Sequence, residues 1–224
     1  MATIGQLSAG VAHELNEPLG SILGFAQLLT KDKGLPEQAS MDINEIIKSS
    51  LHAREIIRKL MLFSKQLPPM TSKVDLNNIV REDLYFLKSR CNKENITLVD
   101  RLDPELPRST ADKSQLHQVL VNLVVNAIQA MPDGGEITIS TRHDDKNVYL
   151  AVSDTGIGMN EKIIKQIFVP FFTTKEISQG TGLGLSVVHG IITAHHGSID
   201  VKSKVGKGSI FEVRLPISHD GEEA

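Results

Sequence analysis

The spacing of apolar residues changes near residue 66, and this change constrains the fold more than any other feature of the chain. Before it, apolar side chains recur in steps of three and four, the spacing of helices that bury one stripe. Beyond it, short runs of alternating apolar and polar residues lie between helical segments, as in mixed α and β domains. The sequence therefore predicts two domains of different architecture, the first helical and the second α+β.

Residues 1–66 are predicted to form an antiparallel helical hairpin. Charged and helix-breaking residues at 31–36 separate two apolar stripes. Because two helices cannot bury such stripes alone, we expect two copies of the hairpin to associate as a dimeric four-helix bundle. Pro18 removes one helical hydrogen bond and predicts a kink in the first helix. The stripes comprise Ile4, Leu7, Val11, Leu15, Pro18, Ile22, Phe25 and Leu29, and then Ile43, Ile46, Ile47, Ile56, Ile57, Leu60 and Met61.

Residues 74–218 are predicted to form an α/β sandwich, after a linker at 67–73 and before a tail at 219–224. Asp75 is a candidate N-cap for a helix that ends near Cys91. Further helices are expected at 114–131 and 183–196, with Gly197 where helices often end. Strands are expected at 96–100, 136–142, 148–153, 199–203 and 209–215.

Composition narrows the class of protein. Apolar residues make up 40% of the chain, enough for a sizeable core. The net charge of -3 provides no basic surface, so no nucleic acid partner is expected. The single cysteine, Cys91, excludes an intrachain disulfide and a cysteine-rich metal site, and it fits a reducing compartment. With neither an apolar run of about 18 residues nor a signal peptide, a cytoplasmic location is expected.

Two glycine-rich segments favour a site for a phosphate-bearing ligand. Residues 154–159 follow a predicted strand, and residues 180–185 open a predicted helix. Glycines let the backbone approach a phosphate, and free amides at a helix start attract anions. Neither segment matches the dinucleotide-binding fingerprint or the lysine-ended phosphate loop. Each segment alone also fits an ordinary turn, so the indication comes from their pairing.

Asn122 and Asn126 are four residues apart and lie on one face of the helix predicted at 114–131. Inside an apolar helix they fit the role of core or capping partners. They also fit a second role, in which a side-chain oxygen coordinates Mg²⁺ already held by nucleotide phosphates. The residues alone leave both readings open.

These segments stand in an order that resembles the sensor histidine kinases. The segments 122–127, 154–158, 168–175 and 180–185 are similar to the N, G1, F and G2 boxes of that family, and 8–19 is similar to its H box. The resemblance covers nearly the whole chain. It implies a dimerisation and histidine phosphotransfer hairpin followed by a catalytic ATP-binding domain of the Bergerat (GHKL) type.

By this resemblance, His13 is the phosphoacceptor. It falls off the apolar stripe, so its ring is expected to face solvent, where a neutral imidazole is a competent nucleophile. Glu14 corresponds to the family's acid that accepts a proton from the ring. Lys175 corresponds to a residue that meets the γ-phosphate, although a solvated surface lysine fits the position equally well.

The resemblance also implies the residues that bind ATP and Mg²⁺. Asp154 would accept a hydrogen bond from the adenine amino group, with Ser209 as its neighbour. Asn126 would hold Mg²⁺, and Asn122 would support the phosphates or the metal. The remaining positions, where the backbone closes on the triphosphate, are Gly156, Gly158, Gly180, Thr181, Gly182, Leu183 and Gly184.

Four positions depart from the family's pattern or invite another reading. Glu17 stands where many members carry Asn or Thr, which puts phosphatase activity toward the partner regulator in doubt. Gln129 replaces a basic residue common three positions after the metal asparagine. His195 and His196 invite a metal reading, but adjacent residues face different sides of a helix, so we interpret the pair as structural.

The expected function is a histidine protein kinase that phosphorylates itself on His13 and passes the phosphoryl group to an aspartate in the receiver domain of a response regulator. Two other functions remain as alternatives: an ATP-driven clamp or ATPase of the same superfamily, and a non-catalytic dimeric scaffold. Because His13 lies close to the first residue, we expect this chain to be part of a longer kinase. Any membrane attachment would then come through a sensor region outside this chain.

Overall fold

The chain forms two compact units, which are described separately. A computed structural model describes residues 2–32, 34–64, 69–174 and 181–217, with side chains for all of these except 2–13, 55, 56 and 58–64. One unit contains residues 1–67 and 175–183, and the other contains 68–174 and 184–224. Among the described helices, none is both long and apolar enough to cross a membrane.

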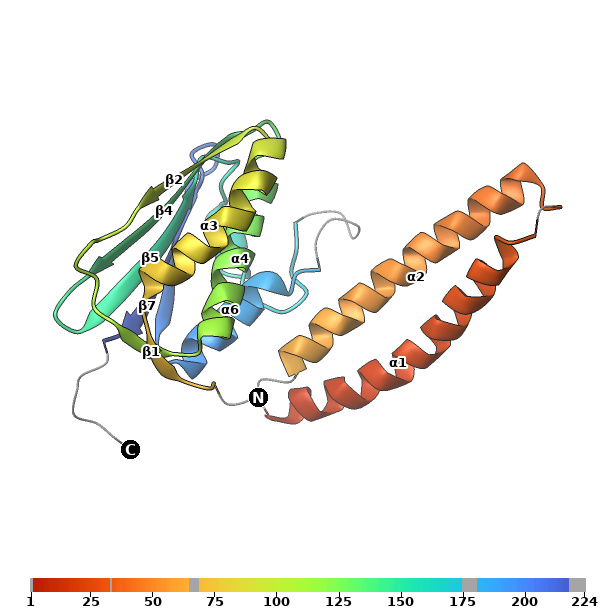
Figure 1. Ribbon diagram of the computed structural model, residues 1–224, viewed down its shortest axis with the longest axis horizontal. Helices are drawn as coiled ribbons and strands as arrows, with labels where there is room; N and C mark the ends of the chain where they lie inside the picture. Colours follow the sequence, from red (N-terminus) through yellow and green to blue (C-terminus); the bar gives the residue numbers. More distant parts are fainter. Residues whose placement is uncertain (1, 33, 65–68, 175–180, 218–224) are drawn as a thin grey trace. The chain divides into compact units, whose positions relative to one another are not determined.

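The first unit is the predicted helical hairpin. Helices α1 (Ala2–Leu29) and α2 (Glu37–Ser64) lie side by side and are joined by a short turn (Figure 1). Leu23, Ala26, Ile43 and Ile57 are buried along the seam between the helices. The α1 helix is assigned without a break through Pro18. Its stripe residues Leu15, Ile22, Phe25 and Leu29 remain exposed, so α2 does not cover these positions in a single hairpin.

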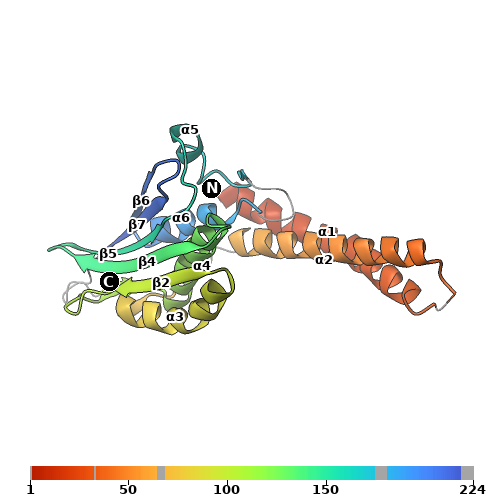
Figure 2. The same cartoon turned by 90° about the horizontal axis from the view of Figure 1, so that it is seen from above.

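The second unit is a two-layer sandwich that confirms the predicted α+β class. Its sheet has the order β2-β4-β5-β7-β6, with β2 parallel to β4 and every other pair antiparallel. Helices α3, α4 and α6 cover one face of this sheet (Figures 1 and 2). The elements are α3 (Leu76–Lys93), β2 (Ile96–Arg101), α4 (Lys113–Gln129), β4 (Gly135–His143), β5 (Asn147–Asp154), α5 (Glu161–Ile164), α6 (Gly184–Ala194), β6 (Ser198–Ser203) and β7 (Ser209–Pro216).

The core lies between the helices and the sheet. Every second residue of β5 is buried, including Val148, Leu150 and Val152, because alternate side chains of a strand point to the same face. The apolar face of α4 meets them with Leu120 and Leu123, which are completely buried. This packing holds α4 against the sheet and so fixes the positions of Asn122 and Asn126, which belong to that helix.

Several details differ from the sequence-based expectations. A two-stranded sheet pairs β1 (Ser72–Val74) with β3 (Ser109–Ala111), and neither strand was predicted. The α4 helix begins one residue earlier than expected and ends at Gln129. The α6 helix ends at Ala194, because His196 takes a left-handed φ of 56° and the amide of Gly197 turns back to the carbonyl of Ile192. The left-handed residue that ends the helix is therefore His196, and Gly197 follows it.

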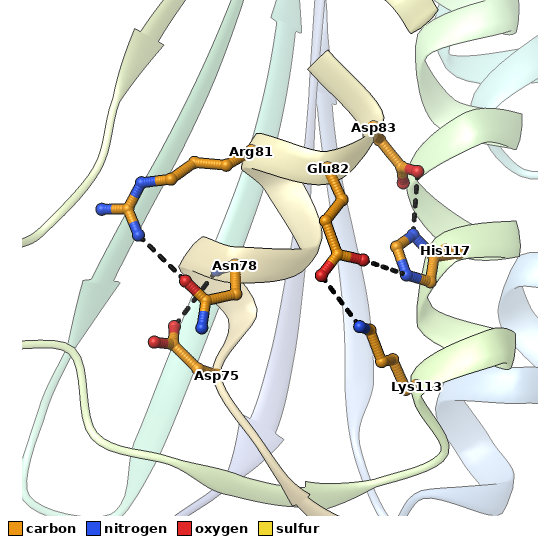
Figure 3. Close-up of polar contacts among 7 residues, drawn as sticks. All are labelled: Asp75, Asn78, Arg81, Glu82, Asp83, Lys113 and His117. Atoms are coloured by element: carbon orange, nitrogen blue, oxygen red, sulfur yellow. Dashed lines mark hydrogen bonds and ion pairs between the residues drawn. The ribbon is translucent and has the colours of Figure 1, made fainter. Parts of the chain in front are cut away.

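A polar bridge joins α3 to α4 on the surface of this unit (Figure 3). Nδ1 of His117 lies 2.8 Å from Oδ1 of Asp83, and Nε2 of His117 lies 3.3 Å from Oε2 of Glu82. Nζ of Lys113 contacts the same glutamate at 2.9 Å. Burial raises the pKa of Asp83, while Lys113 lowers the pKa of the exposed Glu82. Asp75 caps α3 as predicted, accepting from the amides of Asn77 and Asn78.

Candidate nucleotide-binding site

Asp154 ends β5 with its carboxylate buried. Its Oδ1 accepts a hydrogen bond from the amide of Gly156 at 2.9 Å. Ser209, its partner in the β5–β7 register, also hydrogen-bonds to the carboxylate. Burial nevertheless raises the pKa of Asp154, and these hydrogen bonds only partly offset the effect. A carboxylate held this way has an acceptor oxygen to offer to a ligand that presents an N–H group.

The loop after Asp154 is built on close backbone approaches that only glycine permits. A Cβ at Gly156 would overlap the carbonyl of Ala130 at the end of α4. Gly158 has a φ of +64°, and a Cβ there would overlap the carbonyl of Lys204. The amide of Ile157 donates to the same Ala130 carbonyl at 3.0 Å. The glycines therefore clamp this loop between α4 and the β6–β7 turn.

The β6–β7 turn contributes residues that the sequence reading missed. The hydroxyl of Ser203 donates to the carbonyl of Gly208 at 2.9 Å, accepts from the amide of Met159 at 2.8 Å, and lies 3.0 Å from the hydroxyl of Ser209. Gly208 has a φ of +83°, and a Cβ there would overlap the carbonyl of Asp154. The two glycines at 206 and 208, just before a predicted strand, were the available signal.

Asn122 and Asn126 lie beside the start of α6, which agrees with their predicted position on one face of α4. An added Cβ at Gly184 would lie 3.7 Å from Oδ1 of Asn122 and 3.7 Å from Nδ2 of Asn126. Both asparagines are half-buried. Both side-chain amides therefore lie within van der Waals distance of the first residue of α6.

The two groups of residues meet around the C-terminal half of α4. Asn126 belongs to the last turn of this helix, and its carbonyl accepts from the amide of Ala130, which the Asp154 loop contacts. Hard oxygen donors beside a helix N-terminus suit a metal-bound polyphosphate, and a buried carboxylate suits a base with an exocyclic amine. These residues thus fit a magnesium–nucleotide complex.

Several predicted site residues lie elsewhere or outside the described parts. Lys175 and Gly180 fall outside the described residues, whereas Thr181, Gly182 and Leu183 lead directly into α6, with Gly182 at a φ of +66°. The backbone of His13 lies in α1, but its side chain is not among those described, so its predicted exposure is not tested. Glu14 is exposed one residue further along the same helix.

The segment before the glycine-rich lead into α6 is anchored by one aromatic contact. The ring of Phe168 lies 5.2 Å from the ring of His189 on α6 and packs against the core. Phe171 is exposed and has a left-handed φ of 66°, which is uncommon for a bulky residue. The next residue, Phe172, packs against the core again.

Comparison with known protein families agrees with this geometry. Residues 3–68 match the His Kinase A (phospho-acceptor) domain. Residues 111–219 match the histidine kinase-, DNA gyrase B-, and HSP90-like ATPase family. The two matches correspond to the helical hairpin and to most of the sandwich.

Full-length relatives extend the comparison. Sporulation kinase E of Bacillus subtilis (strain 168) is 36% identical over 222 residues, which are 98% of this chain and 29% of the relative. The signal transduction histidine-protein kinase AtoS of Escherichia coli (strain K12) is 36% identical over 224 residues, 100% of this chain and 36% of the relative. The chain thus spans about a third of the length of these curated relatives.

Solved structures show the same arrangement of elements. ShkA, crystallised in complex with AMPPNP, aligns with a TM-score of 0.77 and 25% identity over 95% of this chain and 46% of its own. Histidine kinase ThkA, in complex with the response regulator protein TrrA, aligns with a TM-score of 0.69 and 30% identity over 96% of this chain and 62% of its own. The chain belongs to the sensor histidine kinase family and comprises its phosphoacceptor and ATP-binding domains.

Proposed function

We propose that this chain phosphorylates itself on His13 with ATP and transfers the phosphoryl group to an aspartate of a response regulator. The observation that carries the proposal is the joint presence of a phosphoacceptor-domain hairpin containing His13 and, in the second unit, residues that fit a magnesium–nucleotide complex. A clamp-type ATPase has no use for the first of these, and an inactive scaffold has no use for the second.

In the nucleotide site, the residues take the following roles. The carboxylate of Asp154 accepts from the adenine amino group, and Ser209 holds that carboxylate in place. Asn126 would hold Mg²⁺, with Asn122 beside it, and the bound ion would neutralise charge on the phosphates. Gly184 places the start of α6 beside both asparagines.

In the helical unit, the chemistry belongs to His13 and Glu14. A ring nitrogen of His13 attacks the γ-phosphorus, the bond from that phosphorus to the bridging oxygen of ADP breaks, and Glu14 accepts the ring proton. Lys175 is proposed to meet the transferring group, where positive charge stabilises the transition state. Glu17 takes no part in this step and concerns only phosphatase activity toward the response regulator.

The active form is proposed to be a homodimer through the hairpin. An open apolar groove of about 400 Å³ runs along it, lined by Leu15, Pro18, Leu19, Ile22, Ala53 and Ile57. Exposed apolar stripes of this extent are uncommon on monomers, and a second hairpin would cover them as a four-helix bundle.

The receiver domain of a response regulator is the proposed phosphoryl acceptor, in keeping with the ThkA–TrrA complex. The unpaired, buried Cys91 suits the reducing cytoplasm as the place of action.

The proposal is tested by incubating the chain with γ-labelled ATP and following label on the protein and in released phosphate. A phosphohistidine is labile in acid and stable in base, so we expect base-stable protein label. A clamp-type ATPase would release labelled phosphate without labelling the protein. A scaffold would do neither, and either of these results would contradict the proposal.

A further inference from the structure

The carboxylate of Asp112 joins the segment that precedes β1 to the start of α4. Its Oδ1 caps α4, accepting from the amides of Ser114 and Gln115 at 2.9 and 3.2 Å and from the Ser114 hydroxyl at 2.8 Å. Its Oδ2 accepts from the backbone amide of Met70 at 3.0 Å. The Met70 side chain takes no part in this bond and is 87% exposed. The chain that enters this unit is thus tied to α4 through one charged hydrogen bond.

His195 connects the same aspartate to the end of α6. Its side chain is 3% exposed, and its Nε2 accepts from the backbone amide of Asp112 at 2.9 Å. Its Nδ1 lies 2.8 Å from the carbonyl of Ile191, one turn back in α6. Because Nε2 accepts, Nδ1 carries the proton and donates to that carbonyl. His195 therefore joins the first residue before α4 to the last turn of α6.

The junction lies at the opposite end of the helix pair from the nucleotide site. Asp112 and His195 bring together the start of α4 and the end of α6, whereas Asn122 and Asn126 lie beside the start of α6 at Gly184. The two helices are therefore antiparallel neighbours, with the junction at one end and the nucleotide residues at the other. Hydrogen bonds thus connect the segment at Met70 to α4 through Asp112 and to the end of α6 through Asp112 and His195.

We propose that Asp112 and His195 are positioning residues for phosphoryl transfer, which fix the direction in which the interdomain segment leaves the ATP-binding domain. The inference rests on the proposed function, because it concerns how bound nucleotide is presented to His13. The junction does not contribute to holding ATP, since the proposed metal- and phosphate-binding residues lie at the opposite ends of α4 and α6. The rate of His13 phosphorylation then depends on the Met70–Asp112 bond, while ATP affinity does not.

A matched pair of variants isolates that bond. Met70→Pro removes the donating N–H, whereas Met70→Ala removes the same exposed side chain and keeps the N–H. A hydrogen bond to a charged group shifts the equilibrium toward the bonded arrangement of its partners by roughly tenfold or more. We therefore expect Met70→Pro to slow autophosphorylation at saturating ATP by roughly tenfold, with ATP affinity within about twofold of the unmodified chain. Met70→Ala should match the unmodified chain in both measurements.

The second pair addresses the histidine. His195→Gln retains an acceptor for the Asp112 amide and should keep most of the rate, while His195→Leu, which has none, should lose it. Equal rates for Met70→Pro and Met70→Ala would overturn the inference. A parallel loss of ATP affinity in Met70→Pro would overturn it too, because the junction would then act on the binding site. Failure of the unmodified chain to become labelled would instead contradict the proposed function.

Discussion

At the scale of single residues, the most informative group is the carboxylate of Asp154. It is 5% exposed and ends a strand, so desolvation raises its pKa while Gly156 and Ser209 hydrogen-bond to the charged form. Burying an acid in this way costs stability at neutral pH, since the contribution from a raised pKa is complete below the pKa of Asp154 in the unfolded chain and is lost as the pH rises through its pKa in the folded chain. The proposed role of this buried charge is recognition of the adenine amino group.

The first prediction follows from this environment. Asp154→Asn should weaken ATP binding by about 10- to 100-fold, because an amide can present a donor where the carboxylate accepted. The melting temperature should not fall, since the variant no longer buries a charge. Calorimetric titration and thermal denaturation measure the two effects. Unaltered ATP affinity in this variant would contradict the adenine role.

A second prediction uses the pKa of the same carboxyl. Protonated Asp154 cannot accept from adenine in the same way, so the affinity of the unmodified chain for ATP should fall as the pH is lowered. Because burial raises the pKa of Asp154, the fall should begin at a higher pH than the pKa of an ordinary aspartate, about 3.9, would give. Asp154→Asn should lack this component of the pH profile. Parallel profiles for the two proteins would assign the effect to another group.

The glycines of the site offer a third prediction with a matched control. Gly158 and Gly206 have similar left-handed φ values of +64° and +73°, but a Cβ at Gly158 would overlap the carbonyl of Lys204, whereas nothing lies within 4 Å of a Cβ at Gly206. Gly206→Ala should cost only the conformational penalty, about 1–2 kcal/mol. Gly158→Ala should cost at least about 1 kcal/mol more and reduce ATP affinity. Denaturant unfolding gives both values, and equal losses would show that the loop relaxes freely.

Several of these site residues could be predicted from sequence because their signals are local. Asn122 and Asn126 are one helical turn apart, and Asp154 precedes two glycines directly after an alternating run. The participation of Ser203 could not be predicted, since it depends on the register that places Ser203 and Asp154 on either side of Ser209. Strand register is a property of the whole sheet and leaves no local mark in the sequence.

At the scale of elements, the same distinction between local and distant signals holds. The long helices have strong periodicity and caps such as Asp75, and they appear where they were expected. Strands β1 and β3 have three residues each and form only because they pair with one another. The end of α6 was placed too late, because a histidine rather than a glycine takes the left-handed position there. Short strands and helix ends of this kind depend on tertiary contacts, and hydrophobic periodicity carries no information about those contacts.

The α3–α4 bridge carries the fourth prediction. Oδ2 of Asp83 has no hydrogen-bond partner among the described residues, and His117 contacts the other oxygen (Figure 3). His117→Leu should lower the free energy of unfolding by about 1–3 kcal/mol, because the buried carboxylate loses this partner. Adding Asp83→Leu should recover much of the loss. Lys113→Ala serves as a control and should cost no more than about 1 kcal/mol, since the Lys113–Glu82 pair is half-exposed. Additive losses in the double variant would show that the contact contributes nothing.

At the scale of the whole molecule, association of the hairpin provides the fifth prediction. Ile22 is 48% exposed and lines the apolar groove, whereas Gln27 is an exposed polar residue on another face of α1. Ile22→Lys should convert the dimer to a monomer or unfold the hairpin, and Gln27→Lys should do neither. Light scattering measures the mass, and circular dichroism reports the helix content. A well-folded monomer of the unmodified chain at micromolar concentration would contradict the dimer.

The proposed function requires one chemical event that involves both units, the transfer of the γ-phosphoryl group of ATP to His13. The most direct measurement compares base-stable label on the unmodified chain with that on His13→Gln, with ATP affinity determined for both. We expect the substitution to abolish the label and to leave ATP affinity nearly unchanged, because His13 lies outside the residues that form the nucleotide site. Label that persists in His13→Gln would contradict the central claim.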